Sequence, residues 1–297
     1  MSIYSGWWHV AYRKLPCGTV LTDIETPFKV IRNNLCAFAA DPFLFEYNGK
    51  VYIFAEICSV IRKGGMIGYS CFDGKKFSKW KVVIKEPYHL SFPNIFMKDE
   101  SIYIVPEAFQ SKCLYAYRAV DFPDVWERSK TILSDIECVD SVFADSGNNE
   151  YLFTYEITDP NNKALYKYLI SDWTALNDTR TLVRSDSENS RPAGNFFRTE
   201  DGTLYRVAQD CKDSYGSAVV FNRVNELNKD AYSEETVQRV ERGGVNLDKK
   251  TNYSGIHTYN GTNRFEVIDL KWQIIHPISL PYKLGRHIIM YFKNKKQ

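Results

Sequence analysis

A hairpin unit that recurs along the chain is the feature of this 297-residue sequence that most constrains its fold. The segment 40–56, ADPFLFEYNGKVYIFAE, has two runs of aromatic and aliphatic residues on either side of an Asn-Gly turn signal. This pattern is typical of a β-hairpin. Similar segments lie at 91–107, 140–156, 191–210 and 257–269. Strand-like stretches with turn residues follow the hairpins and would add two strands to each unit.

Four strands per unit, repeated five times at spacings of about 50 to 60 residues, predict an all-β fold, a five-bladed β-propeller. We expect one domain with blades near 36–86, 87–135, 136–187, 188–242 and 250–297. Little sequence remains after Asp269, so segment 1–35, around Trp7 to Ile31, should complete the fifth blade. The alternative is a two-domain β-sandwich.

Composition limits the classes of function. A net charge of +2 argues against a nucleic-acid-binding protein. The seven cysteines are scattered and form no CxxC pair, so we expect free thiols and neither a metal nor a cofactor. The N-terminal residues do not form a signal peptide, which favours a cytoplasmic location. The basic segment 291–297, YFKNKKQ, could contact an anionic membrane surface or be a solvated end.

The hairpins place polar residues where strands begin and end. In an antiparallel pair the first residue of one strand faces the last residue of its partner. Asp41 should therefore approach Glu56, and Asp140 should approach Glu156. Three further groups should form in the same way: His89 and Ser91 with Glu107, Arg191 with Gln209 and Asp210, and His257 with Asp269. In a propeller the first strands line the axis, so these groups would form a polar ring.

Crowded carboxylates can carry out acid/base chemistry. Their pKa values separate, so that one stays protonated near neutral pH while another is ionised. Such a pair suits reactions at a glycosidic bond. The ring therefore indicates a carbohydrate-handling site.

The ordered motifs ADPFLF, YIFAE, YIVPEA, FPDVW, DSVF, RPAG and LYRVAQDC resemble those of a known domain. It is the N-terminal domain of plant glucosamine inositolphosphorylceramide transferases and of bacterial relatives linked to surface-polysaccharide biosynthesis. The resemblance covers roughly residues 36–270. More distantly, the pattern is similar to five-bladed glycoside hydrolases of family 43, which use a catalytic base, a pKa-tuning Asp and a catalytic acid.

This resemblance implies roles for individual residues. Asp41 matches the base and Asp140 the pKa-tuning residue, and the acid is Glu107 or, as the alternative, Glu56. The plant enzymes carry a separate transferase domain after the propeller, and this sequence shows neither that domain nor a DxD element. Transferase activity therefore does not follow from the resemblance alone.

The remaining ring residues have two interpretations each. His89, His257, Gln209 and Asp210 could bind sugar hydroxyls or be structural. Arg191 could bind a carboxylate or phosphate of the ligand, or clamp the acidic ring internally. Tyr88, Phe92 and Tyr215 could stack on a sugar or belong to the blade core.

Three functions remain open. The first is a sugar-transferring enzyme of surface-polysaccharide or glycolipid assembly, acting on a carbohydrate or nucleotide-sugar ligand beside other assembly proteins. The second is an intracellular glycoside hydrolase that uses Asp41, Glu107 and Asp140 with water. The third is a non-catalytic module that binds a glycan or a partner.

Overall fold

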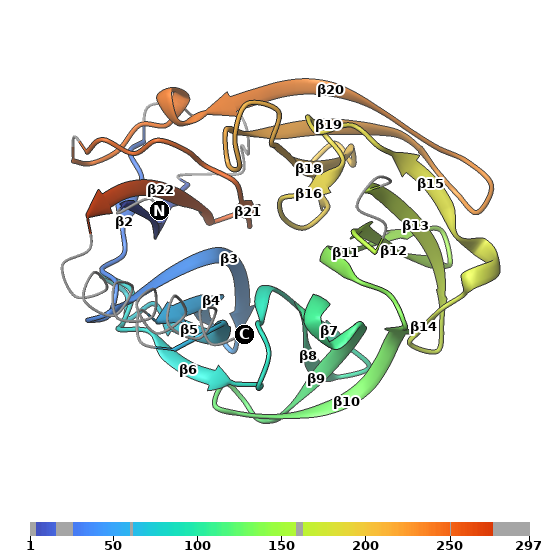
Figure 1. The fold of residues 1–297 in the computed structure, drawn as a ribbon, viewed down its shortest axis with the longest axis horizontal. Helices are drawn as coiled ribbons and strands as arrows, with labels where there is room; N and C mark the ends of the chain where they lie inside the picture. The colour runs from blue at the N-terminus through green and yellow to red at the C-terminus, as the bar shows by residue number, and fades with distance from the viewer. Residues whose placement is uncertain (1–3, 16–25, 60–61, 159–162, 250, 276–297) are drawn as a thin grey trace, which may run out of the picture.

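Five antiparallel sheets surround a common axis in the computed structural model (Figure 1). It describes residues 4–15, 26–59, 62–158, 163–249 and 251–275. The predicted five-bladed propeller is confirmed, and the two-domain sandwich is not formed. Among the described residues, no helix has the length and apolar character needed to cross a bilayer. The basic segment 291–297 lies outside the described residues.

Each sheet runs from an innermost strand at the axis to an outer strand at the rim. The first contains β3 (Ala37–Tyr47), β4 (Lys50–Ser59), β5 (Gly65–Cys71) and β6 (Lys81–Ile84). The second contains β7 (Ser91–Lys98), β8 (Ser101–Glu107), β9 (Cys113–Asp121) and β10 (Val125–Ser134). The third contains β11 (Cys138–Ser146), β12 (Asn149–Glu156), β13 (Ala164–Ser171), β14 (Thr174–Ala175) and β15 (Thr181–Arg184). Short 3-10 helices occur at Phe109–Ser111, Asn177–Thr179 and Arg242–Gly244.

The fourth and fifth sheets differ from this simple order. The fourth has a divided inner edge and contains β16 (Arg191–Pro192), β17 (Phe197–Arg198), β18 (Leu204–Asp210), β19 (Ala218–Leu227) and β20 (Tyr232–Glu241). The fifth contains β21 (Tyr259–Gly261), β22 (Phe265–Ile275), β1 (Tyr4–Lys14) and β2 (Lys29–Val30). Strand β1 pairs with β22 from Tyr4–Ile275 to Lys14–Phe265, so the two ends of the described chain share one blade.

The inner strands of the first three blades carry the same irregularity. Register breaks occur after Ala40 in β3, after Ser91 in β7 and after Val139 in β11. The following residues, Asp41, Phe92 and Asp140, have φ values of 50°, 45° and 50°. A β-bulge re-aims the residue that it inserts, and Asp tolerates the left-handed region better than most residues. The bulges therefore give Asp41 and Asp140 equivalent positions in two different blades.

The core lies between neighbouring blades. One cluster of buried apolar residues extends across the first four blades and includes Phe43, Phe92 and Phe153, none of which is exposed to solvent. The rings of Phe43 and Phe92 meet edge to face with centroids 4.8 Å apart. Burying each such ring stabilises the fold by about 1.5–3 kcal/mol. This packing fixes the bulges, and with them the direction of the acidic side chains.

Candidate functional site

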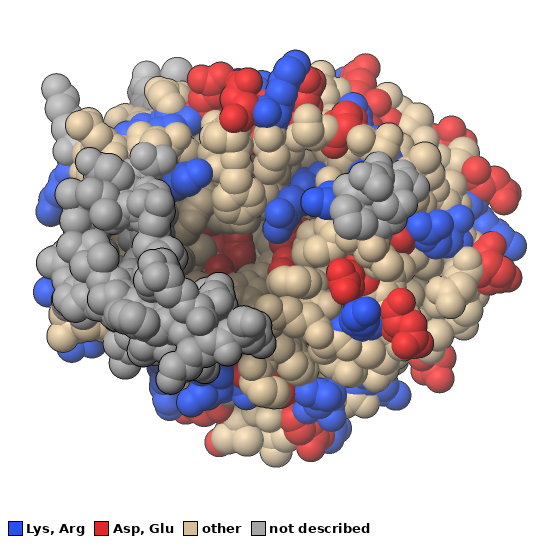
Figure 2. All heavy atoms as spheres, in the orientation of Figure 1, with Lys and Arg blue, Asp and Glu red and all other residues tan. Residues whose placement is uncertain are grey.

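Polar side chains from all five blades converge on the axis at one end of the propeller. Figure 2 shows a hollow at the centre of this face with acidic atoms at its floor. Buried polar groups are costly unless they are paired or used in function. The ring is buried and contains these residues: Asp41, Glu56, Ser91, Glu107, Asp140, Gln209, His257 and Asp269.

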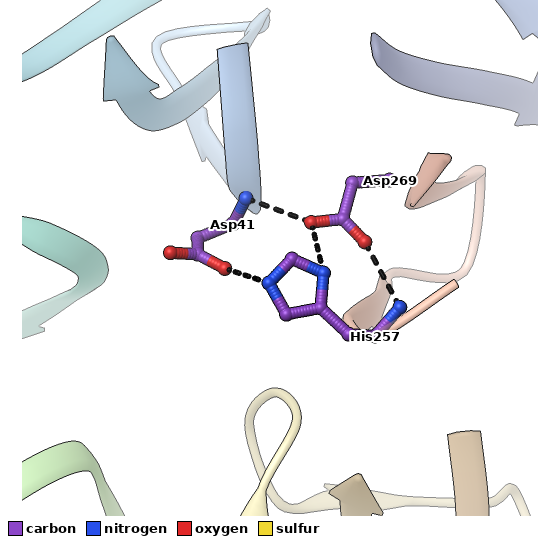
Figure 3. A group of neighbouring side chains, drawn as sticks. All are labelled: Asp41, His257 and Asp269. Atoms are coloured by element: carbon purple, nitrogen blue, oxygen red, sulfur yellow. Dashed lines mark hydrogen bonds and ion pairs between the residues drawn. The ribbon is translucent and has the colours of Figure 1, made fainter. Parts of the chain in front are cut away.

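Asp41, His257 and Asp269 form a cluster where the first and fifth blades meet (Figure 3). His257 Nε2 lies 3.0 Å from Asp41 Oδ1, and His257 Nδ1 lies 2.8 Å from Asp269 Oδ2. Asp269 also accepts hydrogen bonds from the backbone N–H groups of Asp41, His257 and Thr258 at 3.0, 3.2 and 3.0 Å. Asp269 therefore fixes the backbone that carries the other two residues.

Within this cluster, His257 and Asp41 carry opposite charges. Burial would lower the pKa of His257, but the carboxylates of Asp269 and Asp41 raise it to about 10. His257 is therefore cationic near neutral pH. Burial would raise the pKa of Asp41, yet the positive charge of His257 and its hydrogen bond hold that pKa below its ordinary value. Asp41 is therefore an ionised carboxylate.

The same three residues offer one nitrogen and two carboxylate oxygens within 4.8 Å of one another. Histidine binds a metal through a neutral imidazole, whose other nitrogen donates to a second-shell group. In this cluster both ring nitrogens face a carboxylate, and the pKa of His257 is raised. In the structure these contacts form an ion-pair network around a protonated histidine.

Arg191 holds Asp140 on the other side of the ring. Its Nε donates to Asp140 Oδ2, and Gln209 Nε2 donates to the same oxygen at 3.0 Å. Gln209 also donates to the Pro192 carbonyl at 2.9 Å. The guanidinium carbon of Arg191 lies 5.3 Å from the ring centroid of Tyr215. Of the two predicted roles for Arg191, the contacts described here are those of an internal clamp.

Glu107, at the end of β8, is the least restrained acid of the ring. It pairs in register with Ser91, and only 5% of its surface is exposed. Arg191 Nη2 is 3.9 Å from Glu107 Oε2, and no described residue forms a hydrogen bond with that oxygen. Burial and the nearby charge of Asp140 raise the pKa of Glu107 well above its ordinary value. Glu107 therefore keeps its proton at a pH where Asp41 is ionised.

Glu56 forms a third group with Cys58 and His89. Cys58 Sγ donates to Glu56 Oε1 at 2.9 Å, and His89 Nε2 lies 3.3 Å from the same oxygen. The Gly65 N–H donates to His89 Nδ1 at 2.8 Å, which leaves Nε2 as the protonated nitrogen of the neutral ring. Burial and the charge of Asp41 raise the pKa of Glu56 to about 8. Burial lowers the pKa of His89.

Two acids do not lie where the hairpin argument places them. Asp210 accepts from Arg239 Nε at 2.7 Å and from the Lys212 N–H at 2.9 Å, toward the outer strand β20. Adjacent residues of a strand point to opposite faces, so Gln209 and Asp210 cannot both face the axis.

Glu156 is the second displaced acid, and it binds Tyr168 and Arg180. The β11–β12 register places it opposite Cys138, whereas Tyr155 lies opposite Val139, the residue before the bulge. In the third blade Tyr155 thus occupies the register position that Glu107 has in the second.

Aromatic and basic residues from distant segments surround His257. Its ring lies 4.1 Å from that of Trp8 and 4.9 Å from that of Tyr215, centroid to centroid. Lys271 Nζ donates to the Tyr215 carbonyl at 2.8 Å. Tyr215 is 42% exposed, so it can stack on a ligand at the mouth of the hollow. The hairpin pattern does not indicate Trp8 or Lys271 as site residues, because neither lies at the end of a repeated hairpin.

Comparison with known protein families identifies the family of this chain. The family model described as "Glucosamine inositolphosphorylceramide transferase 1, N-terminal" matches residues 5–273. The chain belongs to this family. The resemblance seen in the sequence motifs is therefore confirmed, and the matched region includes every ring residue.

Plant proteins that carry the name of this family are similar to the chain. Glucosamine inositolphosphorylceramide transferase 1 of Oryza sativa subsp. indica is 31% identical over 275 residues, which cover 89% of this chain and 34% of the relative. The Arabidopsis thaliana protein of the same name is 32% identical over 242 residues, covering 78% of this chain and 30% of the relative. The chain thus spans about a third of the length of the curated relatives that it matches.

Solved structures that resemble this member of the family are glycoside hydrolases at low sequence identity. The catalytic domain of a GH62 α-L-arabinofuranosidase from Coprinopsis cinerea has a TM-score of 0.60 and 11% identity, covering 88% of this chain and 97% of that one. An endo-arabinase from Bacteroides thetaiotaomicron has a TM-score of 0.55 and 14% identity, covering 79% and 92%. These likenesses establish the shared fold.

Proposed function

We propose that this propeller is a sugar-transferring enzyme of surface-polysaccharide or glycolipid assembly, with its active site in the axial ring. The observation that carries the proposal is the contrast between two buried carboxyls of the ring: burial beside Asp140 raises the pKa of Glu107, whereas contact with His257 lowers the pKa of Asp41. A protonated and an ionised carboxyl at one site supply the acid and the base for a reaction at an anomeric carbon. Membership of a family named for a glycolipid transferase supports a carbohydrate substrate.

Glu107 acts as the general acid in the proposed reaction. As the bond between the anomeric carbon of the donor and the leaving oxygen breaks, Glu107 gives its proton to that oxygen. No hydrogen bond to a described residue occupies Glu107 Oε2, so the carboxyl keeps hydrogen-bonding capacity for the leaving oxygen. The negative charge of Asp140 keeps the proton on Glu107 before the reaction, which is the pKa-tuning role that the family resemblance implies for Asp140.

Asp41 acts as the general base toward the acceptor. It takes the proton of an acceptor hydroxyl while the oxygen of that hydroxyl bonds to the anomeric carbon. Among the described residues, Asp41 Oδ2 accepts a hydrogen bond from the Phe92 N–H alone, at 3.3 Å, so it retains capacity for a further donor. The reaction leaves Asp41 protonated and Glu107 ionised, and proton exchange with water restores both.

Product analysis tests this proposal. The purified chain is incubated with nucleotide sugars, lipid-linked sugars and aryl glycosides, with and without alcohol acceptors, and the products are identified by mass spectrometry. We expect a glycosylated acceptor whose formation requires both substrates. Release of free sugar without any transfer would instead indicate a glycoside hydrolase, in which the same acid and base act on water. Saturable binding with no product from any donor would contradict an enzymatic role and favour a glycan-binding module.

A further inference from the structure

The propeller has a second cavity at the end opposite the acidic ring. Strand β7 begins beside Glu107 at Ser91, whereas the cavity contacts β7 from Asn94 to Lys98. At about 3.3 Å per residue, Lys98 lies roughly 20 Å along the strand from Ser91. The cavity also contacts the β11–β12 turn and the inner edge of the fourth blade, and its volume is about 550 Å³. This volume lies within the range of small-molecule sites.

Half-buried phenylalanines form the apolar part of the cavity. Phe96 and Phe143 come from neighbouring blades, with ring centroids 5.2 Å apart, and Phe197 comes from the fourth blade. Aromatic rings at such sites pack against the apolar face of a sugar and leave the hydroxyls of the sugar free to form hydrogen bonds.

Three asparagines supply unused hydrogen-bonding groups. Asn94 is 2% exposed and donates to the Ser141 carbonyl at 3.3 Å, but no described residue donates to its side-chain oxygen. The side chains of Asn148 and Asn195 make no hydrogen bond with any described residue, and both line the cavity. An amide offers both donors and acceptors, so it matches a hydroxyl in either role.

The charged residues around the cavity balance one another. Lys98 pairs with Glu150, and Arg198 donates to the backbone carbonyls of Gly202 and Asp145. With the Asp145 carboxylate, two cations face two anions, so the lining has no net charge. This balance does not favour a phosphate or a carboxylate as ligand.

We propose that this cavity is a second carbohydrate site, which binds an uncharged sugar residue of a glycan through Phe96, Phe143 and the three asparagines. The site goes beyond the proposed function, because it lies outside the acidic ring and requires no chemistry there. It would hold an extended glycan on the face of the propeller opposite the reaction.

Side-chain amide NMR tests this proposal on the whole chain. Maltotriose, cellotriose, xylotriose, glucuronic acid and inorganic phosphate are titrated separately to about 20 mM, a range suited to millimolar affinity. The amide signals of Asn148 and Asn195 are assigned from the Asn148→Ala and Asn195→Ala variants. We expect at least one neutral trisaccharide to shift these signals saturably. Each variant should weaken that binding by about three- to tenfold, as loss of a hydrogen bond does.

Two control variants test whether trisaccharide binding depends on this cavity. Asn225→Ala removes an exposed amide outside the cavity and should leave the affinity unchanged. Glu107→Gln should also leave it unchanged, so a failure of the axial site is distinguishable from a failure of this one. The proposal is overturned if no neutral trisaccharide shifts the signals, if phosphate or glucuronic acid binds more tightly, or if both asparagine variants bind normally.

Discussion

Replacement Glu107→Gln is expected to reduce the rate of sugar transfer by about 10²- to 10⁴-fold, the usual contribution of a general acid. Glutamine keeps the size of the side chain but has no carboxyl proton to give. Because the affected Oε2 has no described hydrogen-bond partner, the fold should tolerate the change. The rate of glycosylated product formation measures the effect, and equilibrium binding of the donor should change little.

A matched control accompanies this variant. Glu200 is exposed in the turn between β17 and β18, at the opposite end of this hairpin from the Arg191–Gln209 pair, so Glu200→Gln should leave the rate unchanged. Asp41→Asn should cause a loss of similar size, because it removes the base. A Glu107→Gln protein with more than about a tenth of the original rate would contradict the role of Glu107 as acid.

Replacement Asp269→Ala is expected to lower the free energy of unfolding by about 4 kcal/mol or more. The substitution leaves three buried N–H groups without their acceptor and removes one of the two carboxylates that stabilise His257. Each unsatisfied buried donor costs about 1–3 kcal/mol, and breaking a buried ion pair costs about 3–5 kcal/mol, although these costs do not simply add. Urea denaturation measures the change.

Two further variants test whether the loss of stability comes from the lost hydrogen bonds. Asp269→Asn keeps an oxygen that can accept the backbone hydrogen bonds, so it should be less destabilising than Asp269→Ala. Asp178→Ala removes an exposed carboxylate at the rim and should change stability by no more than about 0.5 kcal/mol. A loss of less than about 1 kcal/mol for Asp269→Ala would show that the cluster does not hold the fifth blade against the first.

The repeat predicted the fold because each blade has the same local sequence pattern. Alternating apolar residues and turn signals define each hairpin, and five such hairpins leave few architectures open. The same hairpin pattern predicted that Asp41, His257 and Asp269 lie at the axis, and the structure brings them within hydrogen-bonding distance.

Glu156 and Asp210 show which features of the site the hairpin pattern does not predict. Glu156 and Asp210 each lie one residue from the position that faces the ring, and a shift of one residue turns a strand side chain to the opposite face. The bulge in β11 changes the count between Val139 and Val142, which no hydrophobic pattern reveals. Trp8 joins the site through the pairing of β1 with β22, a contact between distant segments.

The protonation of the ring carboxyls is the most direct test of the proposed chemistry. Carboxyl ¹³C signals of a chain labelled at Asp and Glu can be followed by NMR against pH, with Glu107→Gln, Glu56→Gln and Asp41→Asn for assignment. The predicted result is a Glu107 that titrates well above the ordinary pKa of a glutamate, a Glu56 that titrates at about 8, and an Asp41 that remains ionised below the ordinary pKa of an aspartate. Finding that Glu107 titrates at or below the ordinary pKa of a glutamate would contradict the account, because Glu107 would then have no proton to give where Asp41 acts as base.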